Sequence, residues 1–477
     1  MKVISLVYLI LYINLISGFL KYPEKNRLSK RIVSMASISS AQEYDDSKVK
    51  LIETTFDMLY SNSLHFEHSN SPVAPRSDGG YYIAFTDKNK YLHILSYDKN
   101  DKLLKDFNIM EKSYPVDITA TENGFAVYML EADSSYHSYL SLYNKSFQLV
   151  KKVEIMNNSE TDNKSVDSTL KKQIIRYGTD SKPEFGMRFM YNPDSGKLIY
   201  SGGRIFLIFS HYNYFLDSGG HTGDTTVTFD NTLNDMDFGS TWGASHSLIQ
   251  SVTADDNYFW TAALSDAYPM GIKVVYTSKT KFYNSNDPIN NKKNIRQYEE
   301  NDELAGSING YMNGSADGKL GGLLYFEKYG IYCLVYAKTP NVSEDSYNGK
   351  NIIYMTTWKF ENNEITEQKT KIVKEFSTGN VMQVRAGKFG DDKVFITYSD
   401  TTGTGGQGYG NVPKGTTPYF YLYEITKQKK LKSDVKLTKL IMNTNEDLRT
   451  FEDGVLIWAT SNKDGKLSII KIGTVNY

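Results

Sequence analysis

The stretch Gly80-Tyr-Tyr-Ile-Ala-Phe-Thr86 is short, apolar and aromatic, and stretches of the same kind recur along the chain. Their mean separation is roughly 60 residues, longer than the spacing of about 40 to 50 residues that is common in sheet-based repeats. Asp, Asn or Gly bounds each stretch, which is typical of β-strands between tight turns. The six further stretches are Gly124-Phe-Ala-Val-Tyr128, Arg204-Ile-Phe-Leu-Ile-Phe209, Tyr258-Phe-Trp-Thr-Ala-Ala263, Gly330-Ile-Tyr-Cys-Leu-Val-Tyr336, Lys393-Val-Phe-Ile-Thr-Tyr398 and Gly454-Val-Leu-Ile-Trp458.

A second apolar strand follows most of these stretches, as in Tyr91-Leu-His-Ile-Leu-Ser-Tyr97 and Tyr419-Phe-Tyr-Leu-Tyr423. The strands are continuously apolar rather than strictly alternating, so we expect both of their faces to be covered. This pattern predicts an all-β fold, a β-propeller of about seven blades, in which each blade is a small sheet packed between its neighbours. A pair of β-sandwich domains is the alternative, although sandwiches would not require a sevenfold recurrence.

The segment Lys48-Val-Lys-Leu-Ile-Glu-Thr-Thr-Phe56 precedes the first repeat, while the last repeat lacks an outer strand of its own. We expect this segment to pair with the last repeat. The pairing would close the ring and remove two exposed sheet edges at once. Residues 48–477 are therefore predicted to form one propeller domain.

Composition limits the classes of function. The chain has 477 residues with 54 Lys and Arg against 55 Asp and Glu, so no excess of basic charge indicates nucleic-acid binding. The single cysteine, Cys333, lies inside an apolar run and is expected to be a buried, unreactive thiol. No motif indicates a cofactor.

The N-terminal residues have the pattern of a secretory signal. Lys2 precedes the almost wholly apolar segment Val3–Leu15, and the small residues Ser17 and Gly18 provide a cleavage site. We therefore expect residues 1–18 to be a signal peptide, residues 19–47 to be a mobile leader, and the mature protein to be secreted without a membrane span. Five candidate glycosylation sites fit this location, at Asn144, Asn157, Asn163, Asn313 and Asn341.

One window, from Arg204 to Lys273, concentrates histidines, tryptophans, polar residues and glycines. Such residues can bind or titrate, and the glycines let a ligand approach the backbone. An internal hydrogen-bond network between two blades would explain the same residues without a ligand. No His-x-x-x-His spacing occurs, so no metal site is predicted. The candidate ligand-binding residues are Arg204, His221, Asp224, Trp242, His246, Gln250, Asp266 and Tyr268.

The hexapeptide Asp237-Phe-Gly239-Ser-Thr241-Trp242 resembles the Asp-box of sialidases and related propellers, Ser-x-Asp-x-Gly-x-Thr-Trp, with Asp235 in place of the leading serine. In that family the box is a structural hairpin turn that recurs in several blades. The resemblance covers six residues and implies the fold. It does not imply sialidase activity, because the arginine triad and the Arg-Ile-Pro opening of that family are not recognisable here.

Two functions fit these observations. The first is a secreted or cell-surface binding module that recognises a glycan or an extracellular protein through its propeller loops. The second is a secreted glycoside hydrolase with paired carboxylates such as Asp224 and Asp266. We expect binding rather than catalysis, and the separation and environment of the carboxylates would distinguish the two.

Overall fold

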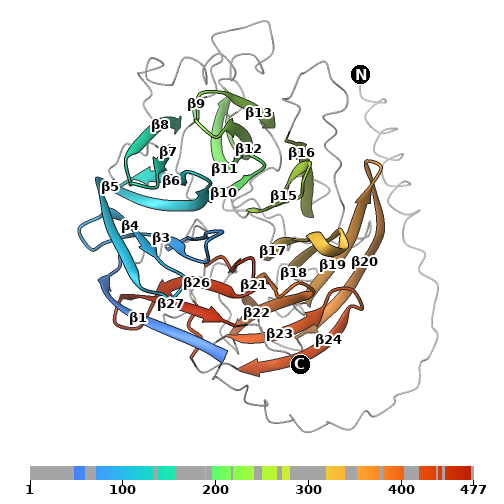
Figure 1. Ribbon diagram of the computed structural model, residues 1–477. Coiled ribbons are helices and arrows are strands. Elements are labelled where there is room, and N and C mark those ends of the chain that lie inside the picture. Colours follow the sequence, from blue (N-terminus) through green and yellow to red (C-terminus); the bar gives the residue numbers. More distant parts are fainter. Residues whose placement is uncertain are drawn as a thin grey trace, which may run out of the picture. The chain divides into compact units, whose positions relative to one another are not determined.

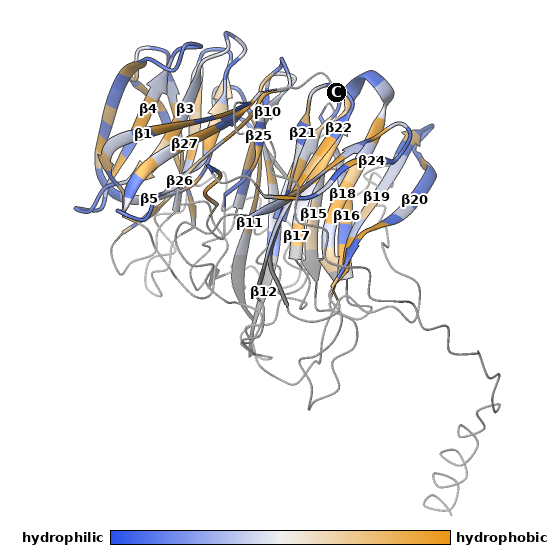
Figure 2. Ribbon diagram, turned by 90° about the horizontal axis from the view of Figure 1, so that it is seen from below, coloured by the Kyte–Doolittle hydropathy of each residue, from blue (hydrophilic) through white to orange (hydrophobic). Residues whose placement is uncertain are grey.

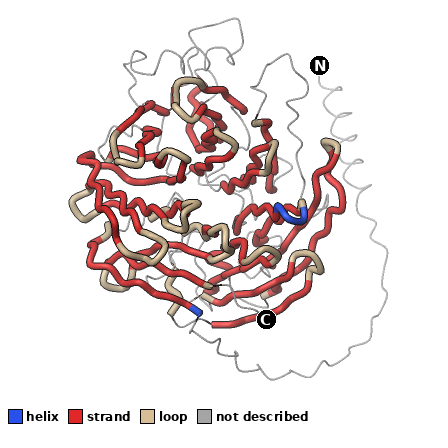
Figure 3. The backbone as a smooth tube through the Cα atoms, in the orientation of Figure 1, coloured by secondary structure: helices blue, strands red, loops and turns tan. Residues whose placement is uncertain are grey.

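The computed structural model describes residues 48–59, 71–132, 138–156, 188–189, 196–215, 219–240, 250–265, 271–279, 319–338, 352–376, 380–401, 418–436, 439–442 and 446–473. Its compact unit, Gln42–Tyr477, is an all-β propeller whose sheets surround a common axis (Figure 1). The predicted class is confirmed, and the alternative of two β-sandwiches is wrong. In the part described, the 3₁₀ turn η2 (Glu327–Tyr329) accompanies the strands (Figure 3), and no helix there is long and apolar enough to cross a membrane.

A seven-stranded sheet comes first along the chain, and one long strand joins its two halves. β5 pairs with β4 as far as Lys112 and with β6 from Ser113 onward. The strands of this sheet, in order, are β2 (Val73–Pro75), β3 (Tyr81–Thr86), β4 (Tyr91–Tyr97), β5 (Leu103–Thr121), β6 (Gly124–Glu131), β7 (Ser138–Asn144) and β8 (Leu149–Met156).

Three further sheets follow, and all of their pairings are antiparallel. The first contains β9 (Arg188–Phe189), β10 (Gly196–Ser201), β11 (Arg204–Phe215), β12 (Gly219–Asp230) and β13 (Met236–Ser240). The second contains β14 (Gln250–Ala254), β15 (Tyr258–Ser265) and β16 (Gly271–Ser278). The third contains β17 (Lys319–Phe326), β18 (Ile331–Lys338), β19 (Ile352–Glu361) and β20 (Glu364–Glu375).

Two four-stranded sheets complete the ring. One contains β21 (Asn380–Phe389), β22 (Lys393–Thr401), β23 (Tyr419–Glu424) and β24 (Lys429–Lys436). The last contains β25 (Arg449–Thr450), β26 (Leu456–Ser461), β27 (Lys466–Ile472) and the N-terminal β1 (Val49–Asp57).

The N-terminal segment closes the ring as predicted. β1 runs antiparallel to β27, from Val49 opposite Ile472 to Asp57 opposite Lys466. Leu51 packs against the cluster that joins the last two sheets, while Ile52 packs against the cluster that joins the last sheet to the first. The closing strand is therefore held by backbone pairing and by apolar contacts on both of its faces.

The strands nearest the axis, here called the axial strands, form a closed cycle of contacts. Each contacts the next in the order β2, β5, β10, β14, β17, β21, β25 and again β2. The recurring apolar stretches are the strands that follow the axial strands, namely β3, β6, β11, β15, β18, β22 and β26. Several axial strands escaped the sequence pattern because they are short and polar, as in Arg449–Thr450.

The number of separate sheets is lower than the expected seven. The described strands form six hydrogen-bonded sheets, because β3 and β6 share the seven-stranded sheet through β5. The other five recurring stretches each lie in a sheet of their own.

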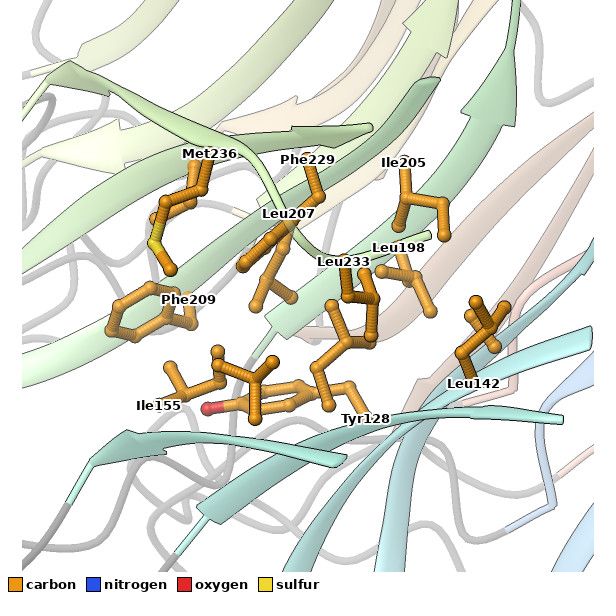
Figure 4. Packing of buried hydrophobic residues seen from close by; sticks show 14 of the residues in the cluster. Tyr128, Leu142, Ile155, Leu198, Ile205, Leu207, Phe209, Phe229, Leu233 and Met236 are labelled. Atoms are coloured by element: carbon orange, nitrogen blue, oxygen red, sulfur yellow. The ribbon is translucent and has the colours of Figure 1, made fainter. Parts of the chain in front are cut away.

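Apolar side chains fill the spaces between neighbouring sheets. In one such space Tyr128, Leu142 and Ile155 from the seven-stranded sheet meet Leu207 and Phe209 from β11 (Figure 4). Because each sheet is covered on both faces, its inner strands, such as β18 and β22, are hydrophobic along their middle, whereas the outer strand β20 is largely polar (Figure 2). Burial of each such side chain stabilises the fold by about 1.5 to 3 kcal/mol.

The Asp-box resemblance does not hold at the level of the backbone. Residues Met236–Ser240 form the outer strand β13, with Asp237 opposite Thr228 of β12. The hairpin turn lies just before this strand, where Asp230 accepts hydrogen bonds from the backbone N–H groups of Asn234 and Asp235. The turn is therefore built on Asp230 rather than on the hexapeptide.

Candidate functional site

A cavity of about 380 Å³ lies on the axis of the propeller. Every axial strand contributes to its wall. An axial strand is paired on one side only, so backbone N–H and C=O groups on its other side remain available at the axis. The cavity wall is therefore polar even where its side chains are small.

A buried network of ion pairs forms one part of this wall. Lys197 of β10 contacts Asp447 at 2.5 Å, and Arg449 of β25 donates to both carboxylate oxygens of Asp117 at 2.7 and 2.8 Å. Arg449 also lies 3.6 Å from Asp447. These contacts connect three different sheets across the axis.

Asp117 is the most enclosed member of the network. Its side chain is fully buried, and it also accepts hydrogen bonds from the backbone N–H groups of Leu198 and Ile118. Both carboxylate oxygens of Asp117 therefore have hydrogen-bond donors inside the wall.

Asp447 is also held in its charged form. Burial acts to raise its pKa, but the positive charges of Lys197, Arg449 and Arg385 outweigh burial and hold the pKa below its usual range. For Arg449, burial acts to lower the pKa, and the negative charges of Asp117 and Asp447 raise it instead. Asp447 and Arg449 are therefore charged at neutral pH.

Arg385 anchors the wall on the side of β21. Its side chain is buried and donates to the backbone oxygens of Glu446 at 3.1 Å, Leu320 at 3.0 Å and Val384 at 3.2 Å. Leu320 belongs to β17, so this arginine connects the axial strands of two sheets and the segment before β25.

The other end of the cavity carries different groups. Lys388, Thr450, Tyr200 and Tyr325 are among its lining residues. The hydroxyl of Thr450 donates to the backbone oxygen of Lys388 at 2.6 Å, which fixes the lysine backbone. Burial is the largest cause of the raised pKa values of Tyr200 and Tyr325, so both phenols remain protonated donors at neutral pH.

Gln250 is the candidate from the sequence that lies in this cavity wall. It is buried, and its amide nitrogen donates to the hydroxyl of Ser210 at 2.5 Å. Asp224 of β12 is buried and lies opposite Ser210 in the strand register. Gln250 and Asp224 therefore both lie near Ser210.

Arg204 is the first residue of β11. It is six residues from Ser210, which corresponds to about 20 Å along a strand. His221 lies in β12 opposite Asn213 of β11. The remaining candidates, Trp242, His246, Asp266 and Tyr268, lie outside the described residues.

Two other predictions concern single residues. Cys333 is fully buried, and burial raises the pKa of its thiol well above the usual range, which confirms an unreactive group. Asn144 lies at the start of a tight turn, where its side-chain oxygen accepts hydrogen bonds from the backbone N–H groups of Ser146 and Gln148. The other four sequons lie outside the described residues.

The sequence analysis missed most of the cavity wall. Asp117, Lys197, Asp447 and Arg449 form no local motif, since the paired residues are separated by 250 and 332 positions. The sequence signal that could have pointed to this wall is a pair of opposite charges beside a short polar strand, as in Asp447 and Arg449. Within the described residues no group of three or more His, Cys, Asp and Glu side chains is arranged to hold a metal ion.

Comparison with known proteins supports the fold. No protein-family model and no curated protein matches the chain. The BP39L lectin from Burkholderia pseudomallei is similar in structure, with a TM-score of 0.50 and 8% identity over 86% of this chain and 98% of the lectin. An α-L-arabinofuranosidase of Fusarium graminearum matches with a TM-score of 0.41 and 10% identity over 89% of this chain and 98% of the enzyme. Sequence identity this low concerns the fold alone.

Proposed function

We propose that this protein is a secreted or cell-surface module that binds a glycan through the axial cavity and the propeller loops around it. The observation that carries the proposal is the cavity of about 380 Å³ with its polar wall. Ligand pockets occupy about 300 to 1,000 Å³, so one or two sugar units fit, whereas a folded protein does not. Tyrosine faces and backbone groups suit sugar stacking and hydrogen bonding. A lectin has the same fold, which is compatible with this function.

The alternative is a glycoside hydrolase, and the electrostatics of the described cavity disfavour it. Asp117 and Asp447 both contact Arg449, so they are close enough to be considered as a catalytic pair. A glycosidase needs one protonated carboxylic acid with a raised pKa. Neighbouring cations lower the pKa of Asp447, so Asp447 does not supply that acid. Both oxygens of Asp117 already accept hydrogen bonds from Arg449 and from backbone N–H groups inside the wall.

We also propose that the ring has seven blades. The cycle of seven axial strands and the change of partner within β5, from β4 to β6 after Lys112, support this number. In this interpretation the seven-stranded sheet is two blades that share one continuous strand.

Secretion is part of the proposal, and the charged and apolar pattern of residues 1–18 supports it. Expression of the full chain in secreting cells tests it. We expect the protein in the medium with its N-terminus at or near residue 19. Retention in the cell with Met1 intact would contradict secretion.

Seven of the eight candidate residues remain part of the proposed binding face, and Gln250 connects them to the cavity, whereas Arg204 lies about 20 Å along β11 from the partner of Gln250. The experiment is a glycan-array screen of the purified secreted protein beside a panel of chromogenic glycosides. We expect binding to a defined set of glycans and no release of chromophore. Gln250→Ala should weaken binding, whereas Gln148→Ala, at an exposed turn, should not. Replacement of His246 or Asp266 by Ala should also abolish binding with little change in melting temperature.

If the protein hydrolyses a glycoside and either Asp224→Asn or Asp266→Asn abolishes that activity, the glycoside hydrolase is favoured instead. Loss of stability in the variants without specific loss of binding would assign the residues to an internal network. Absence of binding on the array, with a correctly folded protein, would remove the proposed function.

A further inference from the structure

Basic side chains outnumber acidic ones in the wall of the axial cavity. Lys197, Arg385, Lys388 and Arg449 line the cavity, and Asp447 is the one acidic lining residue among those described. Asp117 neutralises Arg449 from behind the wall, and the buried Glu446 lies beside Arg385. Among the described lining residues themselves, basic groups outnumber acidic groups by three.

Lys388 is a basic lining group that has no ion pair with a described residue. Lys197 contacts Asp447, and Arg449 contacts Asp117, but no ion pair or hydrogen bond joins the ammonium group of Lys388 to a described residue. The lysine is half-buried in the wall. A charge without a counter-ion in a partly enclosed site interacts strongly with an incoming anion, because fewer water molecules screen it.

We propose that the axial cavity binds the acidic group of an anionic saccharide, with Lys388 as its counter-ion. The inference rests on the proposed glycan-binding function and specifies the class of glycan. The carboxylate of a uronic acid and a sulfate ester share the chemistry that is needed here, a compact anion that accepts charge-assisted hydrogen bonds. Tyr200, Tyr325 and Thr450 supply the neighbouring hydroxyl groups and ring faces for the sugar.

The charge around the cavity also indicates the mouth through which such a ligand enters. Exposed carboxylates occur in six of the turns that follow the axial strands, at Asp78, Glu122, Asp256, Glu327, Asp391 and Glu452. Asp78 and Asp391 are paired with Arg76 and Lys328, and the other four carboxylates repel an anion that approaches this face, although water and salt screen them over about 8 Å. The opposite mouth, near the first residues of β10 and β14 with Lys197 and Gln250, is the favoured entrance.

The test measures binding of the full chain to three oligosaccharide sets of equal length: neutral, uronic-acid-bearing and sulfated. Calorimetric titration at two salt concentrations is the readout. We expect at least one acidic set to bind about tenfold or more tightly than the neutral set, and added salt to weaken only that binding. Lys388→Met should lose this preference, Lys388→Arg should retain it, and the matched control Lys105→Met, at an exposed position of β5, should not change it.

Each outcome separates this inference from the function on which it rests. Binding of the uronic-acid set identifies a carboxylate as the ligand group, and binding of the sulfated set identifies a sulfate ester. Equal binding of neutral and acidic sets, unaffected by Lys388→Met, overturns the inference and leaves glycan binding intact. No binding of any set overturns both. If Lys388→Met loses affinity equally for all three sets and melts at a lower temperature, the lysine stabilises the fold rather than binding an anion, and the inference is also overturned.

Discussion

At the scale of single residues, Asp117 connects several axial strands, although no motif in the sequence indicated this role. It accepts hydrogen bonds from Arg449 of β25, from the backbone of Leu198 in β10 and from Ile118 in its own strand. Three axial strands therefore depend on one buried carboxylate. Its hydrogen bonds position Arg449 in the cavity wall.

Asp117→Asn is expected to lower the free energy of unfolding by about 3 kcal/mol, because Arg449 loses the nearer of its two counter-ions and the new amide NH₂ group points at a hydrogen-bond donor. Urea unfolding measures the change. The double variant Asp117→Asn with Arg449→Met should lose less than the two single variants together, because removal of both partners leaves no unpaired charge. Asp256→Asn, in an exposed turn, is the control, and an equal loss there would contradict the assignment.

At the scale of elements, β1 stabilises the ring more than its peripheral place suggests. It supplies the outer strand of the last sheet, and Ile52 and Phe56 also pack against the cluster shared with the first sheet. Lys50 and Lys471 both contact Asp101, in the turn before β5. The strand therefore connects the last sheet of the propeller to the first.

A chain that begins at residue 58 is expected to melt at a much lower temperature than a chain that begins at residue 42. Without β1, the edge of β27 is exposed and the apolar groups that β1 covered meet water. Thermal unfolding followed by circular dichroism compares the two chains. Equal melting temperatures would show that the ring does not depend on this strand.

At the scale of the whole molecule, ion pairs on the outer side join neighbouring sheets. Asp101 accepts from Lys471 at 2.9 Å, and Asp434 of β24 accepts from Lys374 of β20 at 2.5 Å. Burial acts to raise the pKa of both carboxyls, but hydrogen bonds from lysine and tyrosine side chains outweigh burial and lower the pKa. The stability of the ring therefore depends on these groups being ionised.

A carboxyl whose folded-state pKa is lowered stabilises the fold above its unfolded pKa of about 3.9, and this stabilisation is lost as the pH falls through the folded-state value. We therefore expect the unfolding free energy to be constant near neutral pH and to decrease below about pH 4. Urea unfolding at several pH values measures the slope. The double variant Asp101→Asn with Asp434→Asn should be less stable at pH 7 and show a flatter decrease in acid. An unchanged slope would show that other groups dominate acid unfolding.

Part of the site could be predicted from the sequence, and part could not. Gln250 was identified because it lies in a window rich in polar and aromatic residues, and it does line the cavity. Arg204 was grouped with it, but Arg204 is the first residue of β11, six residues from Ser210, the residue that Gln250 contacts. Nearness in sequence does not show which end of a strand a side chain occupies, because a hairpin reverses the chain every few residues.

The sequence by itself determined the strands, the recurrence and the closure by the segment that became β1, because these depend on local patterns of apolar residues and turns. It also determined the burial of Cys333, which lies in a continuous apolar run. Only the tertiary structure decided the axial cavity and its charges. Lys197 and Asp447 are 250 positions apart, and Arg449 and Asp117 are 332 apart. Such pairs exist only where the ring brings its axial strands together, and a polar residue in a short strand does not reveal its partner.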